Sequence, residues 1–133
     1  MTIKVYAFDV DETLEVSGGP VTLASLMDLR VAGHIVGLCG NLNAFCSRVN
    51  GWQHLISFTL NFDTWPVIGG SMGSILSKDV WLRVFRQTTF PLADDYVLVG
   101  NILGVSGDSD DQGAAERAGW RFLSERDFAA GAR

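Results

Sequence analysis

Residues 5–14 decide the fold, and they read Val5-Tyr6-Ala7-Phe8-Asp9-Val10-Asp11-Glu12-Thr13-Leu14. An apolar run is followed at once by two carboxylates that lie two residues apart. Side chains two apart point to the same side of an extended strand, so we expect Asp9 and Asp11 to converge where the strand ends. The alternative interpretation is a polar turn after a buried strand, a position where Asp is common.

The acid pair favours a functional site over a simple turn. In open α/β sheets, ligands bind outside the carboxyl ends of the strands. Two carboxylates held close together repel each other unless a positive charge lies between them, and Mg²⁺ prefers such oxygen ligands. An Asp carboxylate can also act as a nucleophile and become an aspartyl-phosphate.

Apolar runs alternate with helical patterns along the rest of the chain. We expect strands at 3–8, 34–39, 55–60, 96–99 and 121–123. We expect helices from Pro20 or Thr22 to Gly33, at 43–49, 78–87 and 111–118, a loop at 61–73 and a fraying helix after Glu125. The strands are apolar throughout, which predicts an α/β fold: a doubly wound, Rossmann-like parallel sheet with helices on both faces, a three-layer sandwich. Right-handed crossovers would bring Asp9, Gly40-Asn41 and Gly100-Asn101 to one edge of this sheet.

Length and composition indicate one domain, residues 1–133, with 47% apolar residues for its core. The net charge of −5 argues against a large nucleic-acid interface, although it leaves room for a small basic pocket. No charged amino-terminal region precedes an apolar stretch, and no run approaches the ~20 apolar residues of a membrane span. We therefore expect a soluble, cytoplasmic protein without a membrane partner. Cys39 and Cys46 are expected to be small buried hydrophobes rather than a disulfide or zinc site.

The segment Asp9-Val10-Asp11-Glu12-Thr13-Leu14 resembles the first motif of the haloacid dehalogenase-like (HAD) phosphohydrolases, and the resemblance extends over residues 4–125. It implies that Asp9 is the nucleophile that accepts the phosphoryl group. It also implies that Asp11 is the general acid for the leaving group and then the base for the attacking water. Thr13, Gly40, Asn41 and Lys78 are the implied phosphate-binding residues.

Two of these assignments have plainer alternatives. The family has Ser or Thr after the second strand, where this chain has Gly40. Backbone N–H groups of Gly40 and Asn41 could still hold a phosphate, or the two residues could form a plain turn. Lys78 opens a helix and matches the family's lysine by its order in the chain, so its implied role is to neutralise the nucleophile and the phosphate. A solvated surface lysine is the alternative.

The last family motif is a strand, an acidic loop and an Ala-rich helix, and it resembles residues 97–119. Asn101 stands where the first acid would follow the strand, and Asp108 could replace that acid. The resemblance implies a Mg²⁺ site made by Asp9, Asp11, Asp108 and Asp111, with Asp110 as a substitute and a backbone carbonyl of Val10 or Asp11 as a further ligand. Alternatively, Asp110 or Asp111 caps the helix.

The sequence thus predicts a Mg²⁺-dependent phosphatase that works through an aspartyl-phosphate. A catalytically weak HAD-like domain that binds a phosphorylated ligand or protein is the alternative, because Gly40 and Asn101 depart from the family pattern. A receiver-like domain is a third interpretation, but its acceptor Asp should follow a later, central strand.

The intervals between Thr13 and the next helix and between Asn41 and Lys78 hold no full extra domain, so we expect no large cap. Family members built in this way have open sites. They tend to act on large substrates, such as phosphoproteins or nucleic-acid ends, or to borrow a lid by forming a homo-oligomer. For this chain we expect a phosphorylated substrate, either a small molecule or a macromolecule.

Overall fold

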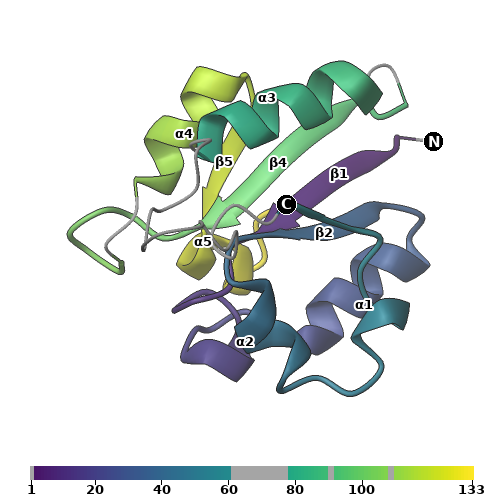
Figure 1. Ribbon diagram of the computed structural model, residues 1–133, viewed down its shortest axis with the longest axis vertical. Coiled ribbons are helices and arrows are strands. Elements are labelled where there is room, and N and C mark those ends of the chain that lie inside the picture. The colour runs from purple at the N-terminus through teal and green to yellow at the C-terminus, as the bar shows by residue number, and fades with distance from the viewer. Residues whose placement is uncertain (1, 61–77, 90–91, 108–109) are drawn as a thin grey trace, which may run out of the picture.

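Five parallel strands form one sheet in the part of the chain that the computed structural model describes, residues 2–60, 78–89, 92–107 and 110–133. They are β1 Lys4–Phe8, β2 Ile35–Cys39, β3 Phe58–Leu60, β4 Asp95–Gly100 and β5 Arg121–Ser124. Their order in the sheet is β3-β2-β1-β4-β5 (Figure 1). The predicted parallel α/β sheet is therefore confirmed.

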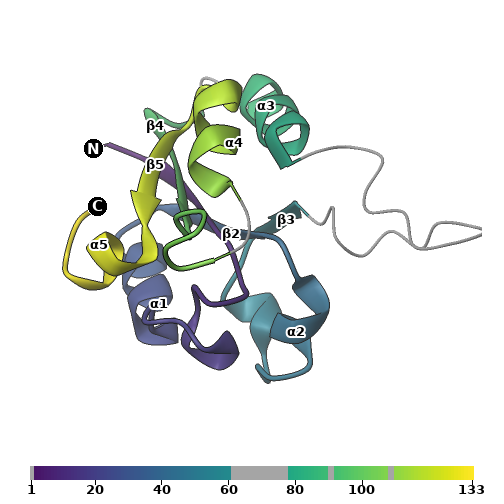
Figure 2. The same cartoon turned by 90° about the vertical axis from the view of Figure 1, so that its left-hand side faces the viewer.

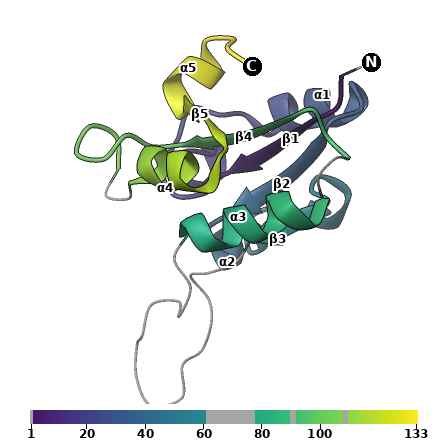
Figure 3. The ribbon, with the colours of Figure 1, turned by 90° about the horizontal axis from the view of Figure 1, so that it is seen from above.

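Strand β1 lies at the centre of this sheet. Phe8, its last residue, pairs with Leu38 of β2 on one side and with Val99 of β4 on the other. Asp9 follows directly, and its N–H donates to the carbonyl of Val99 at 2.9 Å. The arrowheads of β1 and β4 lie at the same side of the sheet (Figure 3). The acidic segment therefore begins in the middle of the carboxyl edge.

Helices cover both faces of the sheet (Figure 2). Helices α1 Leu23–Val31, α2 Leu42–Cys46 and α5 Glu125–Ala129 share one apolar core, and α3 Lys78–Thr89 and α4 Asp111–Ala118 share the other. Alternate residues of β1 divide between these cores: Tyr6 and Phe8 face the first, whereas Val5 and Ala7 face the second. The predicted three-layer sandwich is confirmed.

Two helix boundaries follow from residues that the sequence marks. The hydroxyl of Thr22 caps α1 by accepting the N–H of Ser25 at 3.2 Å. Helix α4 ends as predicted at Gly119, which adopts the left-handed conformation with φ of 78°. Helix α3 runs two residues beyond its predicted end at 87, to Thr89, and α2 stops at Cys46, before its predicted end at 49.

The third strand is shorter than the predicted range 55–60. A short 3₁₀ helix, η2 Trp52–His54, precedes it, and the carbonyl of Trp52 accepts the N–H groups of both Leu55 and Ile56. These backbone groups are used locally, so the pairing with β2 covers only Phe58–Leu60. The loop predicted at 61–73 lies outside the described residues.

The helix predicted after Glu125 is confirmed as α5, but the prediction that it frays is wrong. Phe128 of α5 is 1% exposed. Its ring meets the rings of Phe8 and Tyr6 edge-on, with centroids 5.2 Å and 6.2 Å away. The Ser124 hydroxyl caps α5 by accepting the N–H of Asp127 at 3.1 Å. One aromatic side chain and one cap thus dock this short helix on the sheet.

Cys39 and Cys46 are thiols and do not form a disulfide with each other. Cys39 is buried, as predicted, whereas Cys46 is only partly buried. Among the described residues, no helix combines the length and the apolar character needed to cross a membrane.

Substituting Phe128→Ala should lower the free energy of unfolding by about 3–5 kcal/mol, because it removes a buried aromatic ring and leaves a cavity. Urea unfolding measures this loss. Asp127→Asn, an exposed change in the same helix, is the matched control and should cost less than about 1 kcal/mol. Equal effects of the two changes would mean that α5 does not dock as described.

Candidate active site

The segment after β1 turns sharply instead of continuing as a strand. The carbonyl of Val10 accepts the N–H groups of Thr13 and Leu14, at 3.2 Å and 3.1 Å. Glu12 has φ of 59°, a left-handed conformation that is rare for residues other than glycine. Such strained backbone is concentrated at functional sites.

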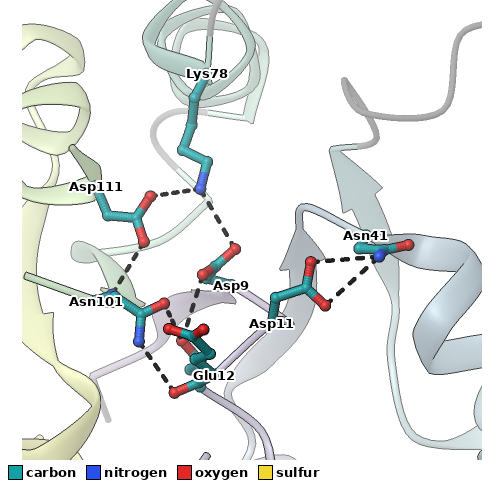
Figure 4. A network of polar contacts seen from close by, with 8 residues as sticks. Asp9, Asp11, Glu12, Asn41, Lys78, Asn101 and Asp111 are labelled. Atoms are coloured by element: carbon teal, nitrogen blue, oxygen red, sulfur yellow. Dashed lines mark hydrogen bonds and ion pairs between the residues drawn. The ribbon is translucent and has the colours of Figure 1, made fainter. Parts of the chain in front are cut away.

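Because of this turn, Asp9 and Asp11 do not lie on one extended strand, and the prediction that they converge as strand neighbours is wrong. Asp9 is buried at 8% exposure, whereas Asp11 is exposed. Asp9 faces Lys78, and Asp11 faces the side chain of Asn41 (Figure 4). The two carboxylates therefore have different surroundings and different partners.

Lys78 lies between two buried carboxylates (Figure 4). Its Nζ is 2.6 Å from Oδ1 of Asp111 and 3.5 Å from Oδ1 of Asp9. These groups come from the start of α3, the start of α4 and the end of β1. Lys78 itself is buried, so the alternative of a solvated surface lysine is wrong.

Burial is the largest single influence on the pKa values of Asp9 and Lys78. It raises the pKa of Asp9 to about 7, an effect that the charge of Lys78 opposes and the charge of Asp111 reinforces. For Lys78, burial acts to lower the pKa, but the charges of Asp9, Cys39 and Asp111 together hold the pKa above its usual value. The ammonium group therefore stays charged, and burial makes Asp9 harder to ionise than an ordinary aspartate.

Asn101 is the residue whose role the sequence reasoning missed. Its backbone N–H donates to Oδ2 of Asp111 at 3.0 Å, and its Nδ2 donates to the carbonyl of Glu12 at 3.0 Å (Figure 4). The Thr13 hydroxyl lies 3.2 Å from Oδ1 of Asn101 and 3.4 Å from Oδ2 of Asp9. Its position directly after β4, the apolar strand next to β1, could have indicated a role in the site. We interpreted this position only as the place of a missing acid.

Asn41 has two roles at the end of β2. Its Oδ1 accepts the N–H of Ala44 at 3.1 Å and so caps α2, while its Nδ2 lies 3.3 Å from Oδ2 of Asp11. Gly40 is buried beside it, and its carbonyl accepts the N–H of Leu42. The structure thus brings Asn41 to Asp11, and phosphate binding by Gly40 and Asn41 stays a prediction.

The predicted metal ligands are only partly brought together. Asp108 lies outside the described residues. Both oxygens of Asp111 accept hydrogen bonds, from Lys78 and from Asn101, and Asp110 caps α4 by accepting the N–H of Gly113 at 3.0 Å. In the described part of the chain, no three His, Cys, Asp or Glu side chains gather as a metal site would require. The carboxylates of Asp9 and Asp11 are hard oxygen donors that suit Mg²⁺, but they have no third carboxylate among those residues.

Models of known protein families, curated proteins and solved structures were compared with this chain, and none of them matched.

The buried carboxyl of Asp9 should make stability fall as pH rises. Its pKa is about 7 in the folded protein, against an ordinary value of 3.8. Between these values the folded protein holds a proton on Asp9 that the unfolded chain has lost, so the contribution of Asp9 to the free energy of unfolding decreases with rising pH. Asp9→Asn lacks this titration and should gain stability relative to wild type, by up to about 1.4 kcal/mol per pH unit.

Thermal unfolding of both proteins in metal-free buffer, from about pH 4 to about pH 8, measures this difference. Measurements extended to about pH 3, below the ordinary pKa of 3.8, where Asp9 is mostly protonated in both folded and unfolded wild type, supply the internal reference. If the stability of wild type instead rose relative to that of Asp9→Asn with rising pH, attraction to Lys78 would outweigh burial. The stated direction of the Asp9 pKa shift would then be wrong.

Proposed function

We propose that this protein is a phosphohydrolase of the HAD-like kind, which cleaves phosphomonoesters through an aspartyl-phosphate on Asp9. The main support is the contact of Lys78 with both Asp9 and Asp111, three residues far apart in the sequence. If the acidic segment after β1 were only a polar turn, it would not need a buried lysine from α3 beside it. A nucleophilic carboxylate that meets a phosphate dianion does require a nearby positive charge.

In the first step, a carboxylate oxygen of Asp9 attacks phosphorus. The new oxygen–phosphorus bond forms as the bond to the leaving alcohol oxygen breaks, and the carboxyl group of Asp11 donates its proton to that oxygen. The exposure of Asp11 suits this role, because an exposed carboxyl can reach a leaving group on the solvent side of the buried Asp9.

In the second step, water attacks the phosphorus of the aspartyl-phosphate. Asp11, now a carboxylate, accepts a proton from this water. The bond between phosphorus and Asp9 breaks, its electron pair returns to the carboxylate, and inorganic phosphate leaves. Both acids then regain their starting states.

Lys78 and the polar groups around Asp9 would hold the phosphoryl oxygens. Lys78 supplies the positive charge, Thr13 a hydroxyl, and Gly40 and Asn41 their N–H groups and the Asn41 side chain. A hydroxyl at position 40 would add a further donor, so its absence is expected to slow turnover rather than abolish it.

We propose Mg²⁺ as the cofactor, held by Asp9 and Asp11 together with Asp108 of the acidic loop and a backbone carbonyl of Val10 or Asp11. When bound, it would neutralise charge on the phosphate. Asp111 belongs to the same proposal, but its two oxygens already accept hydrogen bonds from Lys78 and Asn101. Within the described residues it therefore serves better to hold Lys78 than to bind metal.

The second candidate function is a domain of this kind that binds a phosphorylated ligand or protein without turnover. The observation in its favour is the side chain of Asn101, which occupies the position of an acid and is hydrogen-bonded within the protein. Binding of orthovanadate without phosphate release would support this function.

Release of nitrophenolate from p-nitrophenyl phosphate, with Mg²⁺ and with EDTA, tests the main proposal. Wild type with Mg²⁺ should turn over, EDTA should stop the reaction, and Asp9→Asn should lose about a thousandfold or more in kcat because it lacks the nucleophile. Asp28→Asn makes the same chemical change at an exposed carboxylate of α1 and should keep full activity. Activity of Asp9→Asn equal to that of this control would refute the proposed mechanism.

A further inference from the structure

Both polar atoms of the Asn101 side chain, and its backbone N–H, have partners within the protein. The backbone N–H is bonded to Asp111, Nδ2 to the carbonyl of Glu12, and Oδ1 lies within hydrogen-bond distance of the Thr13 hydroxyl. The residue is 3% exposed, so water competes little for these bonds. Asn101 thus joins the start of α4, through its backbone, to the turn that follows β1, through its side chain.

Local backbone hydrogen bonds hold the turn, such as those from Thr13 and Leu14 to the carbonyl of Val10, and Asn101 adds a side-chain bond from the segment that follows β4. Glu12, at φ of 59°, is in a conformation that an ordinary residue leaves unless its surroundings hold it. The bond from Nδ2 of Asn101 fixes the carbonyl of this same residue. Asp11 comes directly before Glu12 and is exposed, so its position depends on how firmly the turn is held.

The other end of this connection is rigid. Asp111 is fully buried and is fixed by Lys78. Gly107 packs so closely on Asn101 that a Cβ at position 107 would lie 2.7 Å from the Asn101 Cβ, which leaves the side chain no room to swing that way. Lys78, Asp111 and Asn101 therefore form a continuous chain of contacts that ends at the turn.

We infer that Asn101 is a positioning residue that holds the turn 11–13 and thereby places the carboxyl of Asp11 at the leaving group. The inference rests on the proposed function, and it gives Asn101 a role other than that of a degraded metal ligand. A carboxylate at position 101 could not donate to the carbonyl of Glu12. It would also add a third negative charge beside Asp9 and Asp111.

Two aryl phosphates with different leaving groups distinguish the misplacement of Asp11 from a general loss of structure in the site. Phenyl phosphate needs a proton from the general acid, whereas p-nitrophenyl phosphate leaves readily without one. With Mg²⁺ present, Asn101→Ala should lose about tenfold more kcat on phenyl phosphate than on p-nitrophenyl phosphate, with KM little changed. Asn101→Asp should show the same selective loss, and more Mg²⁺ should not restore it.

Any of three results in these measurements would overturn the inference. Equal losses on the two esters would mean that Asn101 only supports the fold. Wild-type or higher activity of Asn101→Asp, or tighter Mg²⁺ binding by that variant in calorimetry, would make position 101 a metal-ligand position. Ser106→Ala is the matched control in the same connection, because the Ser106 hydroxyl accepts the N–H of Ile102 and does not bond the turn; this variant should behave as wild type.

Amide hydrogen exchange judges the inference even if wild type proves to have no phosphatase activity. Asn101→Ala should speed exchange at the N–H groups of Glu12, Thr13 and Leu14, which are hydrogen-bonded within the turn and to Ser17. Exchange in β1 and β4 should stay slow, which controls for unfolding. If wild type shows no turnover but Asn101→Ala speeds exchange, the proposed function is refuted and the role of Asn101 in holding the turn is supported. If exchange is unchanged, Asn101 does not hold the turn.

Discussion

One ammonium group, Nζ of Lys78, lies between two buried carboxylates and links the parts of the carboxyl edge. It joins the first residue of α3 to the end of β1 through Asp9 and to the first residue of α4 through Asp111. Removing one partner from such a buried group is costly, because the remaining charge stays buried without compensation. Apolar residues packed at this position would stabilise the fold as well as the ion cluster does. A buried cluster of charges in their place is expected of a functional site.

The parallel sheet explains how residues so far apart meet. With β1 central, the polar residues that follow β1, β2 and β4 emerge at neighbouring points of one edge. Asp9 and Lys78 lie on the inner side of this edge, and Asp11 and Asn41 on the solvent side. Burial therefore gives the two acids different surroundings, with Asp9 buried against Lys78 and Asp11 exposed beside Asn41.

Much of this arrangement could be predicted from local pattern. Apolar runs gave the strands, Thr22 and Gly119 marked helix ends, and Lys78 and Asp9 were paired in advance by the resemblance of the sequence. What failed depended on contacts between distant residues. The turn at Glu12 separates Asp9 from Asp11, the ring of Phe128 docks a helix of five residues, and Asn101 bonds a turn 89 positions earlier. None of these has a periodic or compositional signal.

Trapping the covalent intermediate tests the central claim, that Asp9 is a nucleophile held ready by Lys78, most directly. Borohydride added during turnover of p-nitrophenyl phosphate reduces an aspartyl-phosphate to homoserine, which peptide mass spectrometry locates in the sequence. The account predicts homoserine at position 9 in wild type, less of it in Lys78→Ala, and none in Asp9→Asn. Turnover without modification of Asp9, or homoserine at position 11 instead, would contradict it.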